Sequence, residues 1–147
     1  MNNSVYIIAE AGVNHNGSLE LAKELVIKAA ESGANAVKFQ TFKASRLVST
    51  SADKAQYQKA TTSTAESQLE MLERLELKQE WHAELVNLCT EKNIQFLSTA
   101  FDTESLDFLS GMDMPFYKIP SGELTNAPLL WQFARHRKPM VLSTGMS

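Results

Sequence analysis

The sequence has little cysteine, no excess of positive charge and no long apolar run. Cys89 is the single cysteine in 147 residues, so it cannot form an internal disulfide or a cysteine-rich zinc site, and a reducing cytoplasm is the expected location. The 14 Lys and Arg against 17 Asp and Glu give a net charge of −3, without the basic excess that nucleic-acid binding needs. The apolar run at 5–9 is too short for a signal peptide or a membrane span. Neither nucleic acid nor a membrane is therefore expected as a partner.

Short apolar runs alternate with longer amphipathic stretches, and this alternation predicts an α/β fold with a parallel sheet. The expected strands are residues 5–10, 36–40, 94–99, 116–119 and 140–144. The expected helices are residues 19–32, 80–92, 104–109 and 129–136, with start signals at Ser18, Asp102 and Asn126 and a capping box from Ser67 to Glu70. The polar segment 43–67 is rich in Ser and Thr, and it is expected to be a long loop or insertion beside the site.

A lysine occupies the inward face of each of two expected strands. In residues 36–40, alternation turns Val37 and Phe39 to one face and Lys38 to the other, and Lys118 alternates in the same way with its apolar neighbours. If helices cover the outer face, as in a TIM-type (β/α) barrel, both lysines point into the lumen near the carboxyl ends of their strands. Because an unpaired buried ammonium is costly, two such lysines indicate a binding site.

The other expected strands also end in polar residues. These are Glu10, Gln40, Ser98 with Thr99, Ser121 with Glu123, and Ser143 with Thr144. Two ammonium groups with several hydroxyls suit a phosphate, and the two carboxylates are candidates for proton handling. A structural alternative pairs Lys38 and Lys118 with Glu10 and Glu123 as salt bridges.

Asn14 and His15 lie in the first strand-to-helix loop, at a helix N-terminus suited to anions or polar substrate groups. Asn14 is therefore a candidate substrate-binding residue. His82 and His136 are expected at the surface, and no spacing of histidines and carboxylates predicts a metal site in this chain. Cys89 lies on the apolar stripe of its helix, so it is expected to be buried packing rather than a nucleophile.

Five segments together resemble the N-acetylneuraminate (sialic acid) synthase family, which includes the legionaminic and pseudaminic acid synthases. They occur in the family's order, with similar spacing, and span nearly the whole chain. The segments are IAEAGVNHNGS at 8–18, AVKFQTF at 36–42, FLSTAFD at 96–102, YKIPSGE at 117–123 and LSTGM at 142–146. Ala100 departs from the family pattern, in which many members have proline at that position.

The resemblance implies condensation of phosphoenolpyruvate with an N-acetylated amino-sugar aldehyde of the N-acetylmannosamine type. The products would be a sialic-acid-like 2-keto sugar acid and inorganic phosphate. The phosphoenolpyruvate-binding residues would be Lys38, Thr99, Lys118, Ser121 and Ser143. Glu10 and Gln40 would approach the sugar, and Glu123 would assist proton transfer or position the attacking water.

The resemblance also implies parts that lie beyond this sequence. A complete (β/α)8 barrel needs about 250 residues, so residues 1–147, with about five strands, are expected to be the N-terminal part of a synthase barrel. The remaining strands, the ligands of a divalent metal (Mn²⁺ or Mg²⁺) and a C-terminal antifreeze-like domain would lie outside it, and the full-length form would be a homodimer.

Two other interpretations stay open. A strand-end lysine with a lowered pKa is a suitable nucleophile, so Lys38 or Lys118 could serve a Schiff-base aldolase. Alternatively, the chain is a noncatalytic half-barrel that binds phosphate or associates with another half-barrel through its open sheet edges.

The expectation of an incomplete barrel can be tested by assaying the isolated chain. With phosphoenolpyruvate, N-acetylmannosamine and Mn²⁺, we expect no release of phosphate above background, because the metal ligands and part of the acceptor site would be missing. Clear turnover would contradict this expectation.

Overall fold

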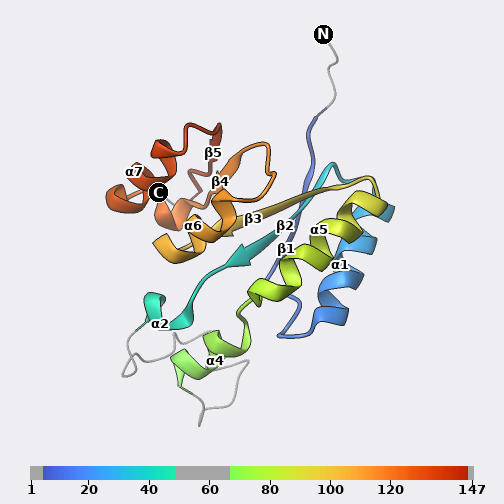
Figure 1. The fold of residues 1–147 in the computed structure, drawn as a ribbon, viewed down its shortest axis with the longest axis horizontal. Coiled ribbons are helices and arrows are strands. Elements are labelled where there is room, and N and C mark those ends of the chain that lie inside the picture. The colour runs from blue at the N-terminus through green and yellow to red at the C-terminus, as the bar shows by residue number, and fades with distance from the viewer. Residues whose placement is uncertain (1–4, 49–66, 146–147) are drawn as a thin grey trace.

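The computed structural model describes residues 5–48 and 67–145. Strand β1 (Ile8–Gly12) leads to helix α1 (Leu19–Glu31), and β2 (Ala36–Thr41) leads to α2 (Ala44–Leu47), as Figure 1 shows. Helices α4 (Gln68–Arg74) and α5 (Gln79–Glu91) precede β3 (Gln95–Ala100). The chain continues through α6 (Thr103–Ser110), β4 (Tyr117–Ile119), the 3-10 helix η1 (Ser121–Glu123), α7 (Ala127–Arg135) and β5 (Met140–Leu142). Within these two ranges, no helix is both long and apolar enough to cross a membrane.

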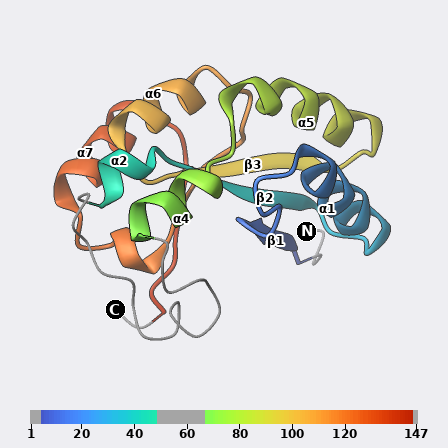
Figure 2. The same ribbon diagram turned by 90° about the horizontal axis from the view of Figure 1, so that it is seen from below.

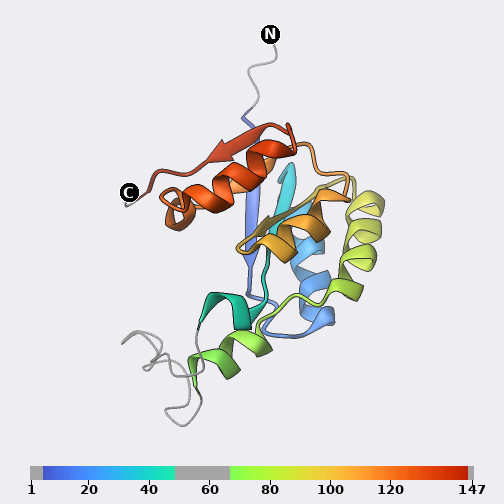
Figure 3. The same ribbon diagram turned by 60° about the vertical axis from the view of Figure 1, so that its left-hand side comes forward.

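All described strands are parallel, which confirms the predicted α/β class. β2 pairs with β1 on one side and β3 on the other, and β4 pairs with β5 in a second sheet. The Thr99 hydroxyl of β3 donates to the Lys118 carbonyl of β4 at 3.0 Å, so the two sheets lie side by side. The helices are arranged along the outside of the strands (Figure 2), and α2 and α4 lie beyond the carboxyl ends of β1 and β2 (Figure 3).

The first strand begins and ends later than the predicted 5–10. β1 starts at Ile8 because that residue is opposite Ala36, the first residue of β2. Residues 5–7 extend past the first residue of β2 and stay exposed; Val5 is 80% exposed. The other strands agree with prediction to within two residues at either end.

The outer face of the three-stranded sheet packs against α1 and α5. Val37 and Phe39 are fully buried there, as their alternation with Lys38 predicts. The neighbouring core residues include Ala22, Val26, Leu85 and Cys89. Burial raises the pKa of Cys89 to about 12, so its predicted role as packing is confirmed.

The predicted helix starts are confirmed. Ser18, Asp102 and Asn126 each accept a backbone N–H in the first turn, and Ser67 and Glu70 form the capping box. The predicted loop at 43–67 is wrong at its start, because residues 44–47 form α2. Residues 49–66 lie outside the described residues, so the prediction that this segment is beside the site stays untested.

Glycine at 17 is required by both backbone conformation and space. Gly17 has φ +75°, and a Cβ atom there would lie 2.5 Å from the carbonyl oxygen of Arg74, at the end of α4. Gly33 has a similar φ of +77°, but a Cβ atom there would meet nothing within 4 Å. The pair therefore separates the cost of a left-handed conformation from the cost of a clash.

We expect Gly33→Ala to lower the free energy of unfolding by about 1 kcal/mol, the cost of a left-handed residue with a side chain. Gly17→Ala should lower it by about 2–4 kcal/mol, because the backbone of α4 must also move. Urea denaturation followed by circular dichroism measures both variants, and equal losses would contradict the predicted clash.

Candidate active site

A hollow of about 420 Å³ lies at the carboxyl ends of the strands. Every residue predicted for the site except Thr99 and Glu123 lines it. The lining residues are Glu10, Gly12, Val13, Asn14, Lys38, Gln40, Phe101, Lys118, Pro120, Ser121 and Ser143. A larger hollow of about 740 Å³ includes Asn35 and Gln95, from the opposite ends of the strands, and none of its described lining residues is cationic. The chemistry of the smaller hollow therefore makes it the candidate site.

Lys38 is buried in β2 and is paired with Glu10 of β1. The parallel register places the two residues opposite each other. Nζ of Lys38 lies 2.7 Å from Oε2 and 2.8 Å from Oε1 of Glu10, so both carboxylate oxygens contact the ammonium. Lys38 is 6% exposed, whereas the Glu10 side chain is 55% exposed. The salt-bridge alternative is confirmed for this pair, although one face of the carboxylate remains open to the hollow.

Lys118 of β4 is held by uncharged oxygens. Its Nζ donates to the Ile119 carbonyl at 3.0 Å and to the Ser143 hydroxyl at 2.5 Å. Burial lowers the pKa of Lys118, the charge of Lys38 lowers it further, and Glu10 partly opposes both effects. The two lysines are thus close enough to repel, and an anion between them would relieve the repulsion.

A bulge follows Glu10 at the end of β1, beside the hollow. The register with β2 shifts between Glu10 and Gly12, and Gly12 has φ +53°. A Cβ atom at Gly12 would lie 3.2 Å from Oε1 of Glu10 and 3.5 Å from Nε2 of Gln40. The contact with Gln40 would be ordinary, but the one with Glu10 would be tight, so glycine leaves room for the Glu10 carboxylate.

Thr99 and Glu123 lie outside the lining of the hollow. Thr99 is buried, and its hydroxyl is used in the bond to the Lys118 carbonyl. Glu123 lies in η1 and accepts a hydrogen bond from Nδ2 of Asn126 at 2.7 Å. The alternative salt bridge between Lys118 and Glu123 is therefore wrong, because neither side chain has the other as its partner in the structure.

Two of the three histidines are fully buried, and the third is exposed. His15 is fully buried against Phe39 and Trp81, and this burial lowers its pKa. From the same loop, Asn14 lines the hollow and His15 does not. The prediction that His82 lies at the surface is wrong, because it is fully buried on the face of α5 that meets the sheet. His136 is exposed, as predicted.

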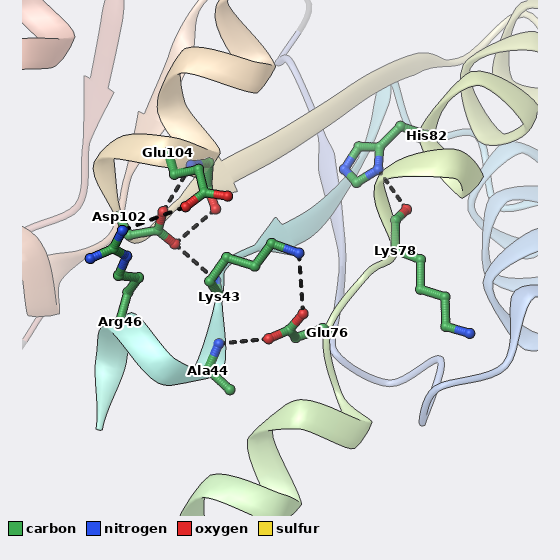
Figure 4. Close-up of polar contacts among 9 residues, drawn as sticks. Lys43, Ala44, Arg46, Glu76, Lys78, His82, Asp102 and Glu104 are labelled. Atoms are coloured by element: carbon green, nitrogen blue, oxygen red, sulfur yellow. Dashed lines mark hydrogen bonds and ion pairs between the residues drawn. The ribbon is translucent and has the colours of Figure 1, made fainter. Parts of the chain in front are cut away.

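The turn that follows β2 is fixed by two carboxylates from later in the chain (Figure 4). Asp102 accepts the Lys43 backbone N–H at 2.9 Å, and Glu76 accepts that of Ala44 at 2.7 Å. Nζ of Lys43 lies 3.5 Å from the Glu76 carboxylate. These contacts hold the chain immediately after the hollow residue Gln40.

The sequence patterns did not single out Val13, Phe101 or Pro120, which are uncharged and line the hollow. Gly12 also lacked a clear signal beyond its place after a strand. Among residues 5–48 and 67–145, no group of three or more His, Cys, Asp or Glu side chains is placed to hold a metal ion.

The structure is an α/β protein in which two lysines, Lys38 and Lys118, converge on one hollow at the carboxyl ends of parallel strands. Residues 25–147 match the model of the NeuB family, and the chain belongs to that family.

Named relatives share nearly all of this chain. It is 55% identical over 141 residues to the N,N'-diacetyllegionaminic acid synthase of Campylobacter jejuni, a match covering 96% of this chain and 42% of that protein. It is 33% identical to the human N-acetylneuraminate-9-phosphate synthase, in a match that covers 96% of this chain and 39% of that protein. The chain thus spans about two fifths of the length of these curated relatives.

Solved structures agree in fold. The N-acetylneuraminic acid (sialic acid) synthetase of Leptospira borgpetersenii, solved with citrate, superposes with a TM-score of 0.80 at 31% identity, covering 99% of this chain and 46% of that one. The spore coat polysaccharide biosynthesis protein SpsE of Bacillus subtilis superposes with a TM-score of 0.73 at 38% identity. That match covers 98% of this chain and 37% of the SpsE chain.

The Lys38–Glu10 pair predicts an asymmetry in stability. Glu10→Ala leaves a buried ammonium without its carboxylate and should cost about 1–3 kcal/mol, less than for a fully buried pair because Glu10 is half exposed. Lys38→Met leaves Glu10 free to hydrate and should cost less than about 1 kcal/mol. Denaturant titration measures both.

Glu31→Ala provides the control, since it removes the partner of the exposed Lys28 and should leave stability almost unchanged. A Lys38→Met variant that is less stable than Glu10→Ala would contradict this account.

Proposed function

We propose that the hollow binds phosphoenolpyruvate and that this chain supplies the binding site for that substrate in a (β/α)8 sialic-acid-type synthase. The enzyme would condense phosphoenolpyruvate with an N-acetylated amino-sugar aldehyde. The observation that carries the proposal is the convergence of Lys38 and Lys118 with Ser121 and Ser143 on one hollow. The synthase names of the relatives support the substrate class.

The charges and donors of the hollow match this ligand. Phosphoenolpyruvate carries a phosphate and a carboxylate, and the two ammonium groups lie beside two hydroxyls that can donate to either. Ser143 already contacts Lys118, so a phosphate there would have a donor and a cation together. Thr99 would act indirectly, because its hydroxyl bonds to the Lys118 backbone.

In the proposed reaction, C3 of phosphoenolpyruvate forms the new bond to the aldehyde carbon, and the aldehyde oxygen takes up a proton to become a hydroxyl. Water adds at C2, and the C2–O bond to phosphate then breaks, giving the 2-keto acid and inorganic phosphate. Glu10 and Gln40 would contact the sugar from the hollow. Glu123 would assist proton transfer or position the water, a role that needs its carboxylate to exchange Asn126 for a reacting group.

Other parts of the proposal concern the longer protein. These are closure of the barrel, the C-terminal antifreeze-like domain, the homodimer and a cytoplasmic location. A divalent metal, Mn²⁺ or Mg²⁺, would use ligands outside this chain. Since the described residues offer no such ligand group, we assign no step of the reaction to a metal.

One observation favours a second candidate, a Schiff-base aldolase that uses Lys118. The lowered pKa of this lysine raises the fraction of neutral amine, which is the nucleophile. Lys38 is less suited, because its Nζ is already held by both carboxylate oxygens of Glu10. Borohydride reduction in the presence of pyruvate would attach the keto acid to Lys118 if this candidate is correct, and peptide mass spectrometry would locate the adduct.

The proposal predicts how phosphoenolpyruvate binding depends on pH. The ligand needs the ammonium form of Lys118, whose pKa lies below the ordinary value of about 10.4. Affinity should therefore be high at neutral pH and fall as the pH rises through that lowered pKa. The phosphate loses its last proton near pH 6, roughly, so the ligand's charge is constant above pH 7.5. Isothermal titration calorimetry from pH 7 to 10 measures this.

Two variants complete the test. Lys118→Met should weaken binding by about tenfold or more, through loss of a charged hydrogen bond. Lys118→Arg keeps its charge throughout the range, so its affinity should change less with pH. An affinity that is constant from pH 7 to 10 in the unmodified chain, or unaffected by Lys118→Met, would contradict the proposed site.

A further inference from the structure

A chain of hydrogen-bonded side chains lies behind the site, between the sheet and α5. Nε2 of His82 lies 2.9 Å from the Thr41 hydroxyl, and that hydroxyl lies 2.7 Å from the hydroxyl of Ser98. On its other side, Nδ1 of His82 lies 3.0 Å from the carbonyl oxygen of Lys78, a bond visible in Figure 4. All three side chains are buried, so this series of hydrogen bonds joins α5, β2 and β3 away from water.

The Lys78 carbonyl oxygen determines which group donates in each of these hydrogen bonds. A carbonyl oxygen can only accept, so Nδ1 of His82 carries the proton and Nε2 of the neutral ring is an acceptor. The Thr41 hydroxyl must then donate to Nε2, and it accepts from Ser98. Every donor in this series therefore has one acceptor. The His82 ring also makes edge-to-face contacts with Phe96 and Phe108, so its surroundings are otherwise apolar.

The groups that face His82 keep it neutral. From β2 it meets the Thr41 hydroxyl, from β3 it meets Phe96, and from α6 it meets Phe108. On its own helix, Glu80 and the Lys78 carbonyl favour the charged ring, but burial outweighs them and lowers the pKa of His82. A protonated ring could no longer accept from Thr41, so the directions of the Thr41 and Ser98 hydrogen bonds would have to reverse.

On the opposite face, β2 carries the hollow residues Lys38 and Gln40, and β3 carries Thr99 beside them. Thr41 directly follows Gln40, and Ser98 directly precedes Thr99, whose hydroxyl bonds the Lys118 backbone. On the outer face of the sheet, the end of β3 is hydrogen-bonded to β2 through Ser98 and Thr41. On the inner face, it is hydrogen-bonded to β4 through Thr99 and the Lys118 carbonyl. Because β2 carries Lys38 and β4 carries Lys118, this connection runs from one lysine to the other.

We propose that His82 is a positioning residue, which through Thr41 and Ser98 fixes the carboxyl ends of β2 and β3 and so sets the separation of the Lys38 and Lys118 ammonium groups. The inference deepens the proposed phosphoenolpyruvate site, on which its binding readout rests. Its geometric part, the coupling of an outer-layer histidine to a lysine pair, is independent of the ligand's identity.

Two substitutions at position 82 separate positioning from packing. His82→Gln places an amide oxygen near the Nε2 position and keeps the bond from Thr41. His82→Asn places an amide near the Nδ1 position, so it keeps the bond to Lys78 and loses Thr41. Both remove the ring from the core, so a packing role predicts the same consequences for both. We expect phosphoenolpyruvate affinity within about twofold of the unmodified chain for Gln and about tenfold weaker for Asn.

A second readout requires no ligand. NMR titration of the Lys118 side chain should give a pKa nearer the ordinary value in His82→Asn than in the unmodified chain, because a displaced lysine is better hydrated and farther from Lys38. His82→Gln should leave it unchanged. If the unmodified chain does not bind phosphoenolpyruvate, the proposed function fails, while the Lys118 titration still decides this inference.

Cys89→Ala is the matched control, since it removes buried packing from the same helix without touching the chain of hydrogen bonds. It should lower stability and leave the affinity and the Lys118 pKa unchanged. If His82→Asn does not fold, Thr41→Val and Thr41→Ser repeat the comparison, with only Ser retaining the hydroxyl. Equal effects in the Gln and Asn variants, or an unchanged Lys118 pKa in both, would overturn the inference.

Discussion

The burial of the Lys38 ammonium against the Glu10 carboxylate is the constraint on which the rest of the site depends. A charged group that is nearly out of water is tolerated only with a close partner. That partner comes from the neighbouring strand, so β1 and β2 must be parallel and in the register that places the two residues opposite each other. The missing side chain at Gly12, just after the bulge, then leaves the carboxylate its room beside the hollow.

The second lysine makes the hollow a binding site rather than a closed ion pair. Lys118 has no carboxylate of its own among the described contacts, and its ammonium is held by a carbonyl and a hydroxyl. Burial and the nearby Lys38 both disfavour its charge. The free site is therefore electrostatically incomplete, and an anionic ligand would supply the compensating charge. This is the physical basis for proposing a phosphate-bearing substrate.

Polar groups outside the hollow carry much of its precision. On one face, the carboxylates of Asp102 and Glu76 fix the turn that follows β2. On the other, His82 and Thr41 tie that strand to α5 and β3. Asp102 and Glu76 lie in the segments before α6 and α5, and His82 lies in α5, so the position of Lys38 and Gln40 depends on the packing of the helices as well as on the sheet. Hydrogen bonds are directional, whereas apolar packing alone tolerates small slips between strands.

Local patterns in the sequence determined the parallel α/β class, the helix starts and the shared face of the two lysines, because periodicity and capping depend on neighbouring residues. The position of His82 had a partial signal, since it lies three residues before the buried Leu85 on one helical stripe. Only the tertiary structure decided that Glu123 pairs with Asn126, that Thr99 holds the Lys118 backbone, and that Phe101 lines the hollow. These outcomes depend on contacts between segments far apart in the chain, where competition among several possible partners is settled by geometry that no local pattern contains.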